Sequence, residues 1–240
     1  MKIKHTLAAL LGCFALSNAH SQEALPINEI VIEKVVSETQ VQPEIANASH
    51  VALGWWIPVE YWGAAFANDP NVTEAVKKEI QDTLNGYAIL GVVQADVSST
   101  GIMNFYSKNE ISQPFTLNYE NEDGKVIDVP PLKNVPNNVS LFLQQLTPIL
   151  AAAMGNMGQN FNFIVYDDRD TENKRILDPY KKGKLLLNFT APSADSDGEI
   201  SASAVIETPL DSFHRARVCP NGKPAHVSWR FCPWSGDALK

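Results

Sequence analysis

The chain has 240 residues, 45% of them hydrophobic, and its 19 basic and 27 acidic side chains give a formal net charge of −8. This length suits one domain of ordinary size, or one domain with a small appendage, and it is ample for a self-sufficient core. No stretch concentrates lysine and arginine, so the composition argues against a surface that binds nucleic acid.

The N-terminus has the pattern of a secretory signal peptide. Lys2 and Lys4 precede an apolar run from Leu7 to Leu16, after which the residues become small and polar. This run is too short to span a bilayer, and no later segment offers 18 uninterrupted apolar residues. We therefore assign residues 1–21 to a signal peptide. We expect an exported bacterial protein, periplasmic or extracellular, whose mature chain has no transmembrane segment.

A weaker alternative is that Leu10-Leu11-Gly12-Cys13 is a lipobox, with Cys13 carrying a lipid anchor. Leu11 is bulky for such a site, and apolar residues continue beyond Cys13. Loss of Lys2 and Lys4 would change the net charge from −8 to −10. An acidic domain is repelled by anionic lipid surfaces, so only the anchor is expected to hold it on a membrane.

Residues 22–50 form a polar leader that contains one apolar run, INEIVIEKVV. We expect this run to pair as an edge strand or to remain flexible. The next segment, HVALGWWI, is expected to be a strand that ends near Ile57, because Pro58 restricts the backbone before it.

One helix is predicted from the apolar residues at spacings of four, four and three between Val76 and Tyr87, with Asn71 or Thr73 as its N-cap. A second is predicted over VSLFLQQLTPILAAAMGNMGQN, whose glycines indicate where it ends. Asn138 or Ser140 would cap it, and Pro148 should kink or split it.

Several short segments have the composition of strands, and Asp123-Gly124 is a strong hairpin signal between two of them. Two helices and six to eight strands indicate an α+β domain over residues 51–210, built on a mainly antiparallel sheet. A small ribbon-like element over residues 211–240 completes the chain. The strand candidates after residue 87 are AILGVVQADV, IMNFYS, FTLNY, KVIDV, FNFIVYD, GKLLLNFT and EISASAVIE.

The C-terminal segment CPNGKPAHVSWRFCPWSGDAL resembles the zinc-ribbon pattern Cys-Pro-x-Cys-Gly…Trp-x-Phe-Cys-Pro-x-Cys-Gly-x-x-Leu. The resemblance covers about a tenth of the chain and implies a ribbon-like pair of turns, without implying an activity. The second cysteine of each turn is missing, and Ser235 stands before Gly236. The matching residues are Cys219, Pro220, Gly222, Trp229, Phe231, Cys232, Pro233, Gly236 and Leu239.

Cys219 and Cys232 are the two cysteines left after removal of a signal peptide containing Cys13. In an oxidising compartment we expect them to form a disulfide, which would contribute about 3 kcal/mol for a loop of this size. Two alternatives stay open. One is a pair of free buried thiols, and the other is a metal site in which His214 and His226 complete the ligand set.

An aromatic cluster between residues 55 and 66 is the other conspicuous feature. Its simplest interpretation is core, but alternation along a strand sends Trp55 and Trp56 to opposite faces. We therefore expect part of it, namely Trp56, Tyr61 and Trp62, to form a surface that binds a partner.

Motifs for catalysis and cofactor binding are lacking: the sequence has no nucleophile elbow, no His-Glu-x-x-His, no P-loop and no dinucleotide fingerprint. We name no catalytic residue and expect no cofactor. The first hypothesis is a non-catalytic module of the cell envelope that binds a protein or a cell-wall ligand. The alternatives are a hydrolase of an envelope polymer that uses unflagged carboxylates, and a metal-binding protein.

Overall fold

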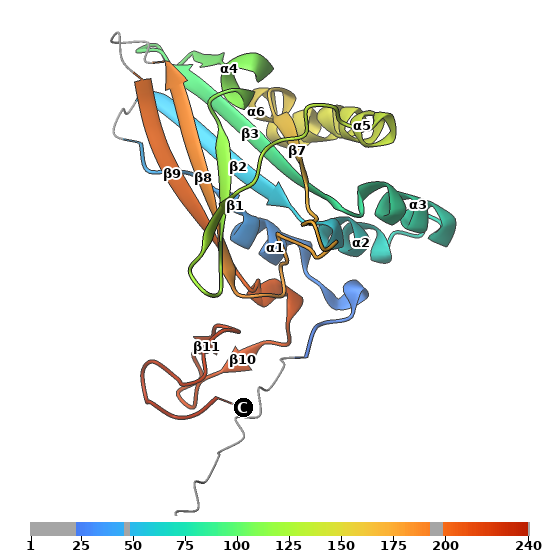
Figure 1. Cartoon of the computed structure of the whole chain (residues 1–240), viewed down its shortest axis with the longest axis vertical. Coiled ribbons are helices and arrows are strands. Elements are labelled where there is room, and N and C mark those ends of the chain that lie inside the picture. Colours follow the sequence, from blue (N-terminus) through green and yellow to red (C-terminus); the bar gives the residue numbers. More distant parts are fainter. Residues whose placement is uncertain (1–22, 46–48, 193–198, 240) are drawn as a thin grey trace, which may run out of the picture.

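The computed structural model describes residues 23–45, 49–192 and 199–239. The predicted signal peptide, the lipobox alternative at Cys13 and the mature N-terminus lie outside these residues. The described chain folds into three layers: a sheet, a second sheet and a set of helices (Figure 1).

The central sheet is organised around β3 (Tyr87–Val97), its longest strand. β2 (His50–Ile57) pairs antiparallel with β3 along its whole length. On the other side of β3, β7 (Asn162–Asp167) pairs with its first half and β4 (Met103–Phe105) with its end. The short β1 (Gln40–Val41) extends the sheet beyond β2.

The second sheet has the antiparallel order β6-β5-β8-β9. Its hairpin of β5 (Thr116–Asn121) and β6 (Val126–Asp128) contains the predicted Asp123-Gly124 turn. β8 (Gly183–Pro192) and β9 (Glu199–Thr208) form a long hairpin. All these strands coincide with stretches that composition singled out.

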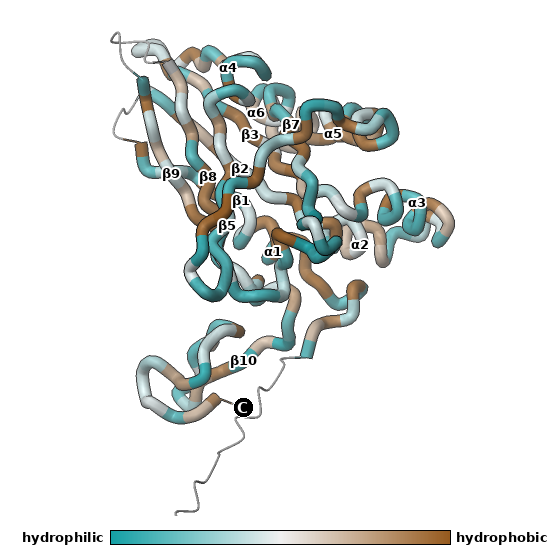
Figure 2. Tube along the Cα trace, viewed as in Figure 1, coloured by the Kyte–Doolittle hydropathy of each residue, from teal (hydrophilic) through white to brown (hydrophobic). Residues whose placement is uncertain are grey.

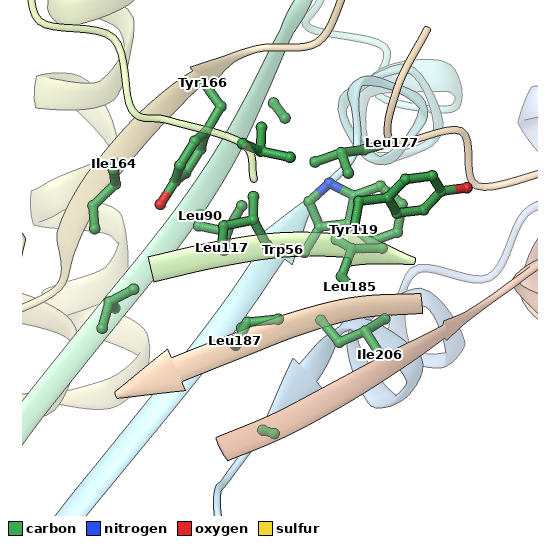
Figure 3. Close-up of a cluster of buried hydrophobic side chains, with 14 of the residues drawn as sticks. Trp56, Leu90, Leu117, Tyr119, Ile164, Tyr166, Leu177, Leu185, Leu187 and Ile206 are labelled. Carbon is green, nitrogen blue, oxygen red and sulfur yellow. The ribbon is translucent and has the colours of Figure 1, made fainter. Parts of the chain in front are cut away.

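The two sheets pack face to face over the main core (Figure 3). Trp56 of β2 projects into this layer and is 0% exposed. Close approach of the sheets requires a glycine at position 54, since a Cβ there would lie 2.8 Å from Leu187 Cδ2 and 2.9 Å from Phe189 Cζ. Figure 2 shows the most hydrophobic stretches of the chain in these central strands. The labelled side chains of the layer are Trp56, Leu90, Leu117, Tyr119, Ile164, Tyr166, Leu177, Leu185, Leu187 and Ile206.

Helices cover the opposite face of the central sheet and enclose a second core cluster. α2 (Val59–Ala67) and α3 (Glu74–Leu84) follow β2 and pack in this second cluster. The short α4 (Lys108–Ser112) follows β4 and instead contributes Ile111 to the main core. As predicted, Thr73 caps α3, where its Oγ1 accepts a hydrogen bond from the Val76 N–H at 3.3 Å.

The long helix α5 (Asn137–Met154) lacks the predicted caps and is not split in two at its proline. It begins one residue after Pro136, with no capping hydrogen bond from Asn138 or Ser140. It also runs unbroken through Pro148, on its exposed side. A proline inside a helix removes a single backbone donor, and water can satisfy the freed carbonyl at an exposed position. The short α6 (Asn156–Gln159) follows.

Within residues 23–45 of the leader, the apolar run INEIVIEKVV is helical rather than an edge strand, and Gln40–Val41 after it pairs at the edge of the central sheet. The leader contains a 3₁₀ turn, η1 (Ile27–Glu29), and the helix α1 (Ile32–Thr39). Buried Val35 and Thr39 lie four residues apart on one side of α1, so the apolar run has helical periodicity. The Glu38 carboxylate also accepts hydrogen bonds from the N–H and hydroxyl of Ser212, at 3.1 and 2.5 Å.

The predicted α+β class, with mainly antiparallel strands, is confirmed. The described chain has six α-helices rather than two principal ones, because α1 and α2 join α3 and α5 as substantial helices. The strands divide between two packed sheets rather than forming one. Residues after β9 form η2 (Asp211–Phe213) and a two-stranded ribbon of β10 (Arg217–Val218) and β11 (Pro224–Ala225).

Candidate binding surface on the C-terminal element

Residues 211–240, called the tail below, contain two turns built alike. In the first turn the Gly222 N–H donates to the Cys219 carbonyl at 2.8 Å, and in the second the Gly236 N–H donates to the Cys232 carbonyl at the same distance. The two glycines have φ values of +79° and +75°. Glycine adopts this left-handed conformation at little energetic expense, which explains why each cysteine is followed by one.

A disulfide joins Cys219 and Cys232, whose Cα atoms are 5.6 Å apart, within the normal range for such bonds. The disulfide expected from the cysteine count is therefore present. Among the described residues after η2, Cys219, Ala225 and Cys232 form a small buried cluster, with Trp229 and Leu239 packed against them. So small a core cannot hold an element together alone, and the disulfide supplies the missing constraint.

We expect the double substitution Cys219→Ser/Cys232→Ser to destabilise the tail by about 3 kcal/mol, because it opens a closed loop between cysteines 13 residues apart. Hydrogen exchange should accelerate within residues 217–239, whereas the denaturation midpoint of the two-sheet body should stay unchanged. A matching loss of stability in the body would mean that the tail and the body unfold as one unit.

Hydrogen bonds within the tail attach its two-stranded ribbon to η2. The Asp211 carboxylate accepts a hydrogen bond from the Val227 N–H at 2.6 Å. Within the tail, the Arg217 guanidinium donates to the carbonyls of Val227 and Trp229 at 3.3 and 3.0 Å. These contacts fix the ribbon to η2, and the ribbon projects from one end of the body (Figure 1).

The N-terminal end of the described chain lies at the same end of the body. The Leu25 N–H donates to the Phe213 carbonyl at 2.9 Å, and the Arg215 N–H donates to the Glu23 carbonyl at 3.2 Å. The Arg215 side chain also forms an ion pair with Glu23 at 3.0 Å. The first described residues and the base of the tail therefore form one junction.

The tail exposes three large apolar side chains: Val218 is 64% exposed, Phe231 61% and Trp234 50%. Trp234 is nevertheless held in place, since its ring packs edge-on against Trp229 at 5.7 Å between centroids. Lys223 Nζ lies 4.7 Å from the centre of the Trp234 ring, within range of a cation–π interaction. A half-exposed but fixed indole is a typical anchor for a binding partner.

The aromatic surface predicted from residues 55–66 is corrected. Trp56 is 0% exposed, because the second sheet covers its face of β2. Trp62 of α2 is 6% exposed, because it packs in the second core cluster, where its ring meets Phe142 of α5. Tyr61 is half-buried and packs edge-on against Trp55 and Trp62. Burial, with a smaller contribution from the negative charge of Glu33, raises the pKa of the Tyr61 hydroxyl. These residues belong to the core.

Our sequence reasoning did not single out Phe231 and Trp234 as exposed. The available signal was the size of the tail. A ribbon of some 20 residues with a disulfide at its centre cannot bury all the tryptophan and phenylalanine side chains that it carries. The small size of the ribbon therefore indicated that some of its aromatic side chains are exposed. The pattern of its apolar residues did not indicate this.

The two histidines of the alternative metal site have different surroundings. His214 is buried and packs edge-on against Tyr180, whereas the His226 ring nitrogen Nδ1 lies 2.7 Å from the Ser228 hydroxyl. The two cysteines are bonded to each other. No group of three or more His, Cys, Asp or Glu side chains within residues 23–45, 49–192 and 199–239 is placed to hold a metal ion.

A hydrolase would need two carboxylates that face each other, and the nearly buried carboxylates of Glu60 and Asp168 are both bound to Arg175. The guanidinium is bidentate to Glu60 at 2.5 and 3.1 Å and donates to Asp168 at 2.8 Å. Burial raises the pKa of Asp168, against the opposing effect of Arg175 and of the Leu177 N–H. This cluster ties α2 to the loop after β7, which is a structural role.

A polar cluster lies at one end of β2 and β3. His50 Nδ1 is 2.8 Å from the Asp96 carboxylate, His50 Nε2 is 3.1 Å from Gln94 Oε1, and the Tyr106 hydroxyl donates to Asp96 at 2.7 Å. Burial and this hydrogen bond raise the pKa of Tyr106. The cluster adjoins a largely apolar pocket of about 280 Å³. The lining comprises Gln42, Pro43, Ile45, His50, Val51, Ala52, Leu53, Val93, Gln94, Ala95, Phe105 and Met157.

Comparison of the chain with models of protein families, with characterised proteins and with solved structures gives no match. No helix in the described part of the chain is both long and apolar enough to cross a bilayer.

Proposed function

We propose that this chain is an exported, non-catalytic binding module of the bacterial cell envelope, and that it contacts its partner through the tail. The observation that carries the proposal is the pair of exposed aromatic side chains, Phe231 and Trp234, on an element made rigid by a disulfide. Aromatic anchors held in one conformation lose little entropy on binding, so they dominate the energetics of many interfaces.

The ribbon resemblance is part of this proposal. The two Cys-Pro turns keep a glycine at positive φ, and the disulfide joins the first cysteine of each turn. This arrangement supports the interpretation that a covalent bond occupies the position of the metal in a zinc ribbon. A stapled ribbon remains folded where metal ions are scarce, which suits an exported protein.

The proposal predicts that the tail retains the protein in the envelope fraction of its native host. After mild osmotic release, the wild-type chain should stay with the envelope, and the Phe231→Ala/Trp234→Ala variant should appear several-fold more in the soluble fraction. A Cys13→Ser background removes a lipid anchor as another cause of retention. The matched control is Leu141→Ala/Ile149→Ala on α5, whose side chains are 60% and 62% exposed.

Equal retention of the tail variant and the wild-type chain would contradict the proposal. Release of the α5 control to the same extent would also contradict it, because retention would then depend on general surface hydrophobicity rather than on the tail.

A further inference from the structure

The charge of the tail is opposite to that of the rest of the chain. Residues 211–240 contain five basic and two acidic side chains, for a net charge of +3, so residues 1–210 carry −11 of the total of −8. The expectation that electrostatics would keep this protein away from anionic surfaces used the net charge of the whole chain. It does not hold for the tail taken alone.

Two of the basic side chains of the tail are free to meet a partner. Arg215 pairs with Glu23, and Arg217 donates to backbone carbonyls within the tail. Lys223 and Arg230, by contrast, are exposed and have no carboxylate within ion-pair distance among the described residues. The single acidic residue of the described ribbon is Asp237.

One of these cations lies over an exposed aromatic ring, and the other belongs to the same small ribbon. Lys223 Nζ is positioned over the Trp234 ring at 4.7 Å, and Arg230 directly precedes Phe231 in the chain. Tryptophan favours the headgroup level of a bilayer, where its ring is buried and its N–H remains hydrated. A basic residue near an anionic leaflet adds further attraction. Exposed tryptophan, phenylalanine and cations on one small element therefore match a phospholipid interface.

The position of the tail makes this contact feasible for an acidic protein. The ribbon projects from one end of the body (Figure 1). At physiological ionic strength, charges more than about 8 Å from a surface are largely screened, so most of the acidic body would not oppose contact through the projecting tail. Glu23 lies at the same end, beside Arg215, so a leader and the tail would approach one surface together.

We infer that the partner of the tail is an anionic phospholipid surface, which Lys223 and Arg230 attract and into which Phe231 and Trp234 insert. This inference rests on the proposed function and names its partner. With two free cations and two aromatic anchors, the binding is weak, reversible and sensitive to salt.

Vesicle sedimentation with the oxidised mature chain tests the inference. The probes are large unilamellar vesicles of phosphatidylcholine alone, and of phosphatidylcholine mixed equally with phosphatidylglycerol. Partitioning onto the mixed vesicles should exceed that onto phosphatidylcholine by about tenfold or more. It should fall as the salt concentration is raised from about 20 to about 300 mM, a range over which the Debye length shortens severalfold. Brominated lipids should quench a tryptophan signal that Trp234→Ala removes.

Two sets of variants locate the contact. Lys223→Gln and Arg230→Gln should each lower partitioning about fivefold, and Phe231→Ala/Trp234→Ala should abolish it. The charge-matched control is Lys78→Gln/Lys108→Gln, on α3 and α4 of the body, which should change partitioning less than about twofold. Retention of the disulfide, read from intact mass, shows that each variant keeps the folded tail.

Three results would overturn the inference: no partitioning onto mixed vesicles, equal partitioning onto both kinds of vesicle, or an equal loss in the body control. If the tail retains the protein in the envelope but vesicles do not bind, the proposed function stands and its partner is a protein or a wall polymer. If the tail variant is also retained in the envelope like the wild-type chain, the proposed function fails with the lipid inference.

Discussion

We expect Trp56→Ala to lower the free energy of unfolding by about 3–5 kcal/mol, the usual range for a large aromatic side chain removed from a core. Trp56 is 0% exposed and projects from β2 into the layer between the sheets, where it faces side chains of the second sheet. Backbone hydrogen bonds within the two sheets hold the surrounding strands in place, so the strands cannot move in to fill the cavity that the indole leaves. Denaturant unfolding followed by far-UV circular dichroism measures the loss without depending on tryptophan emission.

The matched substitution is Trp234→Ala in the tail, which should change the unfolding free energy of the body by less than about 0.5 kcal/mol. Trp56→Phe keeps an aromatic ring, so its loss of unfolding free energy should lie between those of Trp56→Ala and Trp234→Ala. This variant can still be measured if Trp56→Ala does not fold. Equal effects of Trp56→Ala and Trp234→Ala would contradict the burial of Trp56 and restore it as a candidate for a binding surface.

Arg175→Met should destabilise the protein by about 3–5 kcal/mol at neutral pH, because it leaves two buried carboxylates without their common cation. The side chains of Glu60 and Asp168 are only 14% and 4% exposed, so water cannot replace the guanidinium. The methionine preserves most of the volume of the arginine stem, which confines the effect to the lost charge and hydrogen bonds.

The loss of unfolding free energy caused by Arg175→Met should become smaller as the pH falls. Burial already raises the pKa of Asp168, and loss of the positive charge of Arg175 raises it further. A carboxyl group whose pKa is higher in the folded state stabilises that state while it is protonated. This contribution is complete below the ordinary pKa of aspartate and is lost as the pH rises through the folded-state value. Unfolding of the variant and wild type at pH 4, 5, 6 and 7 measures the trend.

Arg215→Met is the control for this effect. Arg215 pairs with Glu23 and Glu29, but its side chain is 53% exposed, so its removal should cost less than about 1 kcal/mol with little dependence on pH. If Arg175→Met lowers the unfolding free energy by the same amount at every pH, the cluster stabilises the fold through packing rather than through charge.

Short sequence signals correctly predicted those features of the fold that depend on residues close together in the chain. The Asp123-Gly124 turn, the Thr73 cap and the disulfide between two Cys-Pro turns each follow from a short segment and its stereochemistry. The leader shows the limit of such reasoning. Its run INEIVIEKVV has the β-branched content of a strand, but contacts of Val35 and Thr39 with the body favour the helix.

The candidate site depended on contacts that no short segment reveals. Whether Trp56 is buried is decided by β8 and β9, which follow it by more than 120 residues, and composition offers no measure of that contact. Whether Trp234 is exposed is decided by the small core of the tail. In both cases the sequence showed that an aromatic residue is present but not whether it is buried, so exposure was predicted for Trp56 and Trp62, which lie in the core.

The backbone hydrogen bond between Leu25 and Phe213 also determines when the N-terminal segment can finish folding during synthesis. A polypeptide is synthesised from its N-terminus, and Glu23 to Leu25 emerge long before their partners. Until residue 215 has followed, Glu23 and Leu25 lack their backbone partners, and α1 lacks the Ser212 contact of Glu38. A chain interrupted before this point would therefore keep an open N-terminal end, and residue 215 is the last that this junction needs.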